Sequence, residues 1–118
     1  MKNYAETILA LEEISSLTKS AKEIEFKISE LEQELDTVKS KRDTMYEKLE
    51  DLLQNIDECL QQTSELNFAS DLSFTLERYK ALNKKELDLC NQIGNARTEF
   101  NKIRKQIHEL LGGLKKLD

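Results

Sequence analysis

The sequence predicts an all-α protein: a two-helix antiparallel coiled-coil hairpin that a partner or self-association completes into a larger helical bundle. Apolar residues recur at alternating spacings of three and four, which places them on one narrow helical stripe. The chain of 118 residues has no Pro and only three Gly, so little interrupts a helix. Its 35% charged residues suit long solvated helix faces better than a thick globular core.

The first helix is expected from about residue 4 to residue 66, because the stripe continues without a break over that range. Its apolar members take the a and d positions of a heptad repeat, which we call the seam positions. They are Ile14, Leu17, Ala21, Ile24, Ile28, Leu31, Leu35, Val38, Met45, Leu49, Leu52, Ile56, Cys59 and Leu66.

A turn is expected at about residues 67–71, followed by the second helix over about residues 72–111 and a short tail at 112–118. Ser70 or Asp71 can cap the second helix, and the Gly112-Gly113 pair supplies a natural stop. The second seam includes Leu72, Tyr79, Leu82, Leu89, Ile93, Ala96, Phe100, Ile103, Ile107, Leu110 and Leu114. The whole chain, residues 1–118, is expected to be a single domain.

A short turn makes the helices antiparallel, so their register can be predicted. With Leu66 opposite Leu72, each a position faces a d position along the hairpin. This register places Arg42 opposite Ala96 and leaves Glu86 facing Leu52. Residues 1–66 are acidic and residues 67–118 are net basic, which favours pairing of the two arms.

Two apolar surfaces remain uncovered in this register, and both are predicted to bind a partner. The first helix overhangs the second over residues 4–20, where its apolar stripe has nothing opposite. The e positions of both helices form an apolar flank in the half nearest the turn. The predicted partner-binding residues are Tyr4, Ile8, Leu11, Ile14, Leu17 and Phe26 in the first surface and Tyr46, Leu53, Leu60 and Leu76 in the second. A symmetric homodimer and a heteromeric helical partner both remain open.

Composition and motif content argue against an enzyme. The net charge of −5 disfavours nucleic-acid and anionic membrane surfaces. We expect no catalytic, cofactor-binding or metal site and no small-molecule substrate, because His108 has no converging partner and Cys59 and Cys90 match no metal spacing. The N-terminal residues lack the apolar core of a signal peptide, so a cytoplasmic location is expected, with leaderless export alongside a client left open.

Small proline-free helical hairpins of this kind resemble helper proteins of specialised bacterial secretion. One such group is the LXG-toxin-associated and WXG-like proteins of type VII secretion, which bind a substrate's N-terminal helices. The turn here reads Leu66-Asn67-Phe68-Ala69-Ser70 instead of Trp-x-Gly, and Tyr46-Glu47-Lys48-Leu49-Glu50 fits the loose export pattern Tyr-x-x-x-Asp/Glu but lies inside a helix. The chain also resembles FliJ-like proteins of flagellar and type III export. Both resemblances imply a non-enzymatic adaptor or chaperone for a helical client, with a co-encoded toxin N-terminal domain as the client in the first.

Overall fold

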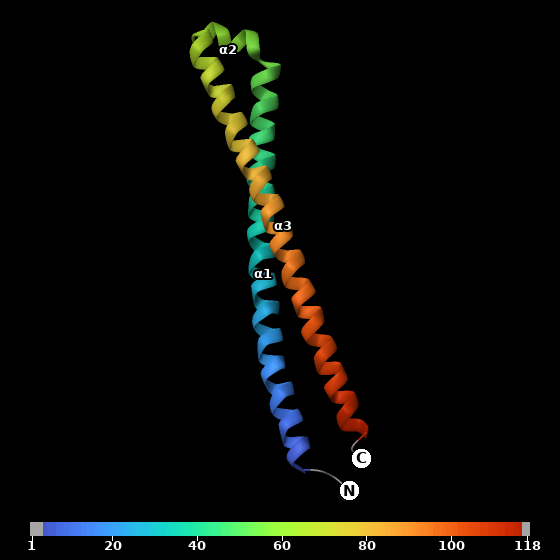
Figure 1. Cartoon of the computed structure of the whole chain (residues 1–118). Coiled ribbons are helices and arrows are strands. Elements are labelled where there is room, and N and C mark those ends of the chain that lie inside the picture. The colour runs from blue at the N-terminus through green and yellow to red at the C-terminus, as the bar shows by residue number, and fades with distance from the viewer. Residues whose placement is uncertain (1–3, 117–118) are drawn as a thin grey trace. The chain divides into compact units, whose positions relative to one another are not determined.

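The computed structural model describes residues 4–116, which contain three helices and no strand. These are α1 (Tyr4–Gln54), α2 (Ile56–Gln62) and α3 (Glu65–Lys116), as Figure 1 shows. The all-α prediction is therefore confirmed for the described residues. None of their helices contains an apolar stretch of the length needed to span a membrane.

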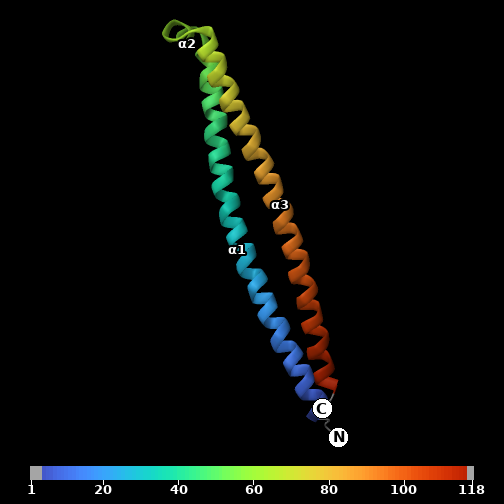
Figure 2. The same ribbon diagram turned by 60° about the vertical axis from the view of Figure 1, so that its left-hand side comes forward.

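The chain divides into two compact units. Within the described residues, the terminal unit comprises residues 4–32 and 91–116, and the middle unit comprises residues 33–90. Each unit contains a segment of α1 packed against a segment of α3, and in the middle unit α2 connects the two helices (Figures 1 and 2). The prediction of a single domain over residues 1–118 stays a prediction.

Burial follows the predicted seam in both units. The buried residues of the terminal unit are Ala21, Leu31, Ile93 and Ala96, and those of the middle unit are Val38, Phe68, Thr75 and Leu89. All eight occupy a or d positions, which alternate at three and four residues. Thr75 is only 1% exposed, and its hydroxyl donates to the Asp71 carbonyl oxygen at 2.8 Å. The heptad pattern thus identifies which face of each helix is covered.

The connection between the long helices lies earlier than the sequence predicted. α1 ends at Gln54 instead of residue 66, and α3 already begins at Glu65. The predicted turn at 67–71 is wrong, because those residues are helical and Phe68 is buried. The chain instead leaves the helical path at Asn55 and again at Thr63 and Ser64.

The break at Asn55 is a local departure from helical dihedrals, with φ −116° and ψ 33°. The backbone N–H of Asn55 keeps its regular helical bond to the Asp51 carbonyl oxygen at 3.1 Å, and its side-chain Nδ2 donates to the same oxygen at 2.9 Å. Side-chain bonds of Asn to nearby backbone groups weaken a helix interior, so the chain can break here without Gly or Pro. After α2, Thr63 adopts an extended conformation with φ −146° and ψ 170°, which ends that helix.

The C-terminal stop is also misplaced in the prediction. α3 continues through Gly112 and Gly113 to Lys116, past the expected end at residue 111. Among the described residues no glycine has positive φ, so neither forms the left-handed cap that ends many helices. Residues 117–118 of the predicted tail lie outside the described residues.

Contacts in the middle unit contradict the predicted register. Arg42 pairs with Glu86 instead of facing Ala96, the Tyr46 ring lies 5.7 Å from the Tyr79 ring, and Glu34 pairs with Lys85 at 3.3 Å. Together these contacts place Leu82 opposite Arg42, a shift of about two heptads along α3. In an antiparallel hairpin, moving the connection by about one heptad along the chain changes the residue that faces a given position by about two heptads. The earlier connection therefore accounts for the shift.

The terminal unit contains residues 4–32 of α1 and 91–116 of α3 as described helix. Arg97 Nη2 donates to Glu32 Oε1 at 2.6 Å, with both side chains about half exposed. Both residues occupy e positions, which border the same flank of an antiparallel pair. Exposed pairs of this kind contribute roughly 0.2–1 kcal/mol, so the buried seam residues dominate the packing energy.

Candidate partner-binding surface

The first turns of α1 carry an apolar face that is separate from the seam. Tyr4 is 75% exposed, Ile8 is 54% exposed and Leu11 is 51% exposed. Their spacing of four and then three residues places all three on one side of the helix. We call these three residues the N-terminal face. Leu9 is also exposed, next to Ile8, and enlarges the apolar surface of this segment.

Two other predicted residues of the same segment belong to the seam. Ile14 and Leu17 are half-buried in the terminal unit, so the expectation that they lie uncovered is wrong. α3 extends to Lys116, and its seam residues Ile107, Leu110 and Leu114 are likewise half-buried. Phe26, by contrast, occupies an f position and is 67% exposed. The apolar surface therefore lies beside the seam, and the predicted overhang does not form because the helices do not pair in the register from which it was predicted.

The second predicted surface lies in the middle unit. Tyr46 and Leu53 of α1, Leu60 of α2 and Leu76 of α3 are all exposed, although Leu60 and Leu76 are close to half-buried. Tyr46 and Leu53 are seven residues apart and share a helix face. The observed register, shifted by two heptads, places Tyr46 beside Leu76, whereas the sequence-based register had paired Leu60 with Leu76. We call Tyr46, Leu53 and Leu76 the middle flank.

Tyr46 in the middle flank and the neighbouring Arg42 both have a raised pKa. The hydrogen bond from Tyr46 to Glu50, together with the negative charge of that carboxylate, raises the pKa of Tyr46 above its usual value. The pKa of Arg42 is raised by its hydrogen bond to Glu86 and then by its hydrogen bonds to Asp43. Tyr46 therefore stays neutral and Arg42 stays charged at physiological pH. The middle flank thus presents an uncharged aromatic side chain close to the ion pair of Arg42 and Glu86.

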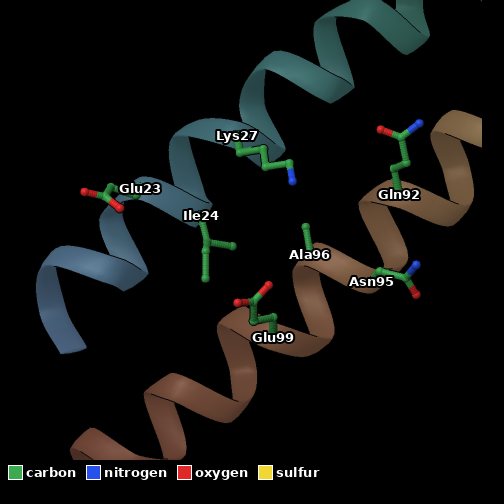
Figure 3. Close-up of a pocket in the computed structure, with 7 residues that line it drawn as sticks. All are labelled: Glu23, Ile24, Lys27, Gln92, Asn95, Ala96 and Glu99. Atoms are coloured by element: carbon green, nitrogen blue, oxygen red, sulfur yellow. The ribbon is translucent and has the colours of Figure 1, made fainter.

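A groove in the terminal unit was not predicted from the sequence. It has a volume of about 440 Å³ and is lined by Glu23, Ile24, Lys27, Gln92, Asn95, Ala96 and Glu99. Figure 3 shows Ile24 and Ala96 facing each other across it, with the amino group of Lys27 directed into the same space. The small side chain of Ala96 at a seam position leaves this hollow. Its carboxylates and amides are spread along both helices and supply no converged catalytic group.

Three further apolar residues are exposed away from the seam. Leu66 is 83% exposed, so its predicted seam position opposite Leu72 is wrong; Phe74 and Leu87, which sequence reasoning did not single out, are each about 60% exposed. The Arg78 guanidinium lies 5.7 Å from the centre of the Phe74 ring, within the range of a cation–π contact. Large apolar residues at b and c positions were the available signal, because those positions face away from the partner helix.

The described residues offer little for metal or thiol chemistry. Residues 4–116 contain no group of three or more His, Cys, Asp or Glu side chains arranged to hold a metal ion. Cys59 and Cys90 are both free thiols, the first half-buried and the second exposed. His108 is exposed on α3. No protein-family model, curated protein or solved structure matches this chain.

Proposed function

We propose that this protein is a non-enzymatic helical adaptor that binds a helical client protein. The observation that carries the proposal is the N-terminal face, where Tyr4, Ile8 and Leu11 expose apolar side chains at helical spacing. Anchors at such spacing are how an amphipathic helix docks onto another helix or into an apolar groove. A face of this kind costs free energy in water unless a partner covers it.

In the proposed architecture, α1 and α3 form an antiparallel coiled-coil hairpin, and the client adds one or two helices to complete a bundle. The N-terminal face and Phe26 contribute one contact surface, and the middle flank with Leu60 contributes another. Ile14 and Leu17 support the first surface from the seam beneath it. No cofactor, nucleic acid or membrane takes part in this function.

The client class is proposed from the resemblance to secretion helpers. We infer a targeting factor for type VII secretion that holds the N-terminal helices of a co-encoded LXG-type toxin in the cytoplasm before export. The FliJ-like alternative replaces this client with an export ATPase ring or its recycling chaperones. The two alternatives differ in the partner that co-purifies with the chain.

The test is co-expression with the N-terminal helical domain encoded beside this gene, followed by affinity purification and light-scattering mass. Replacing Ile8 and Leu11 by Asp should abolish the complex without loss of helical circular dichroism, because both side chains are exposed. The matched control places the same two charges at the exposed residues Ser15 and Ser16 and should retain the complex. Complex formation that survives the Ile8 and Leu11 substitutions would contradict the proposed docking face.

A structural homodimer is the second candidate, and the middle flank favours it. Two copies that bury Tyr46, Leu53 and Leu76 against each other would form a four-helix bundle. Replacing Leu53 and Leu76 by Glu should then reduce the mass in solution to that of a monomer at every concentration. A wild-type protein that is monomeric without its client would exclude this candidate and leave the adaptor proposal intact.

A further inference from the structure

The seam of the middle unit is compatible with more than one register. A heptad pattern repeats every seven residues, so sliding one helix past the other by whole heptads returns an a position to face a d position. The register with Leu66 opposite Leu72 satisfies the apolar pattern as well as the observed one does. Something other than apolar periodicity must therefore choose between them.

Arg42 and Glu86 distinguish the two registers. Between Leu35 and Leu52 on α1 and between Phe68 and Leu89 on α3, they are the only charged residues at seam positions. Their side chains form an ion pair and are 25% and 21% exposed. In the observed register Arg42 lies opposite Leu82, and Glu86 is one helical turn further along the same face.

We propose that the Arg42–Glu86 pair is a register lock, which selects the observed pairing of α1 with α3 over the register displaced by two heptads. Displacement by two heptads would place Arg42 opposite Ala96 and Glu86 opposite Leu52. Displacement by one heptad would place Arg42 opposite Leu89 and Glu86 opposite Met45. Displacement by two heptads leaves Glu86 about ten residues, roughly 15 Å, from the residue opposite Arg42, so two partly buried charges lose their partner, and an unpaired buried charge is strongly destabilising. Displacement by one heptad keeps Glu86 within about one helical turn of the residue opposite Arg42, so the ion pair does not act against that register. This inference stands independently of the proposed adaptor function.

The register displaced by two heptads is an alternative pairing that the sequence allows, because the connecting segment continues the α1 seam. Ile56, Cys59 and Leu66 follow Leu52 at seam spacing, and α2 is already helical. In the observed register Ile56 is 38% exposed, Leu66 is 83% exposed and α2 buries no side chain. Displacement by two heptads would place Leu66 opposite Leu72 and Cys59 opposite Tyr79. Burial of apolar surface at the connection thus favours the displaced register, whereas the ion pair and the burial of Ile14 and Leu17 oppose it.

Two cysteine pairs report the register by intrachain disulfide formation. Met45→Cys with Tyr79→Cys, in a Cys59→Ser and Cys90→Ser background, reports the observed register, where positions 45 and 79 face each other. Tyr79→Cys with the native Cys59, in a Cys90→Ser background, reports the displaced register. In the observed structure Cys59 lies in α2, and position 79 lies fourteen residues, roughly 20 Å, along α3 from its start at Glu65, which is too far for a disulfide.

Each reporter is equilibrated in a glutathione redox buffer, and the linked peptides are quantified by mass spectrometry, which also separates intrachain from interchain bonds. With Arg42 and Glu86 present, only the first reporter should become linked. Arg42→Leu with Glu86→Leu makes every heptad displacement compatible with the seam. It should raise the ratio of displaced to observed linkage by at least about tenfold, the effect of one to two kcal/mol.

The control exchanges the two charges, Arg42→Glu with Glu86→Arg, which keeps an ion pair at the same seam positions. It should restore linkage of the first reporter alone. Circular dichroism should show that all variants remain helical, since apolar substitutions strengthen a seam. If the double Leu variant is helical and still links only through positions 45 and 79, the lock proposal is overturned. The same holds if the charge exchange links as the double Leu variant does.

Discussion

The Oγ atom of Ser64 accepts a hydrogen bond from the backbone N–H of Asn67 at 3.1 Å, and this contact caps the first turn of α3. A side-chain oxygen at this place satisfies one of the four backbone donors that a helix start leaves unpaired. We expect Ser64→Ala to lower the free energy of unfolding by about 1 kcal/mol, measured by urea denaturation followed by circular dichroism.

The control for the cap is Ser70→Ala, at a position that the sequence had suggested as the N-cap of the second helix. Ser70 is exposed within α3, where Ala is the better helix former. This substitution should leave stability unchanged or raise it by a few tenths of a kcal/mol. A larger loss at Ser70 than at Ser64 would contradict the observed start of α3.

Leu89 and Leu87 differ by two positions on α3 but are 3% and 62% exposed. Leu89→Ala removes a buried side chain and leaves a cavity, so we expect it to cost about 2–5 kcal/mol of unfolding free energy. Leu87→Ala removes the same atoms from the surface and should change stability by roughly 0.5 kcal/mol or less. Similar losses at both positions, measured by denaturation midpoints, would show that Leu87 is covered in solution.

Tyr46 should titrate at higher pH in the folded protein than in urea, because its hydrogen bond to Glu50 raises the pKa of the phenol above 10.0. The folded-state pKa is the higher one, so the stability from this contact is fully present below the unfolded pKa. It is lost as the pH rises through the folded pKa. The measurement is phenolate absorbance in a Tyr4→Phe, Tyr79→Phe background, so that only Tyr46 contributes.

Glu47 and Glu50 are both close to Tyr46 in the sequence, and substituting each in turn provides the comparison for this titration. Glu50→Ala should return the pKa of Tyr46 toward the value measured in urea. Glu47→Ala removes an equally exposed charge that is not a cause of the shift and should have little effect. An unchanged Tyr46 titration in the Glu50 variant would argue against the hydrogen bond.

Gly94 lies inside α3, and a Cβ built at this position meets no atom within 4 Å. Gly94→Ala should therefore raise the free energy of unfolding by roughly 0.5–1 kcal/mol, because Ala loses less backbone entropy in a helix. Gly113→Ala, close to the end of α3, should give a smaller gain, since the last turn frays. A loss of stability at Gly94 would indicate that a partner approaches the helix at this point.

The heptad pattern was sufficient to predict the covered face of each helix. Leu31, Val38, Leu89 and Ile93 were assigned to the seam from spacing alone, and all four are buried. Off-seam apolar residues such as Ile8 and Leu53 were also correctly expected to be exposed. Spacing succeeds here because a long helix buries whichever side carries its apolar residues.

The register could not be predicted in the same way, because periodicity is unchanged by a shift of whole heptads. The prediction therefore depended on locating the turn, and Asn67, Ser70 and Asp71 place three turn-forming residues within a short segment. The structure breaks the helix at Asn55, where the dihedrals leave the helical region and the side chain bonds to the Asp51 carbonyl oxygen, and no sequence motif predicts this break. The sequence-based register faced Arg42 with Ala96 and Glu86 with Leu52. Pairing the two charged seam residues with each other would have excluded that register.

The short helix α2 also determines where the chain can accept foreign sequence. Its seven residues bury no side chain, so replacing or lengthening Ile56–Gln62 removes few packing contacts. The entropy cost of a longer closed segment grows only slowly with its length. An epitope or a fluorophore attachment peptide could therefore be inserted in α2, where it would label the molecule without disturbing either the seam or the N-terminal face.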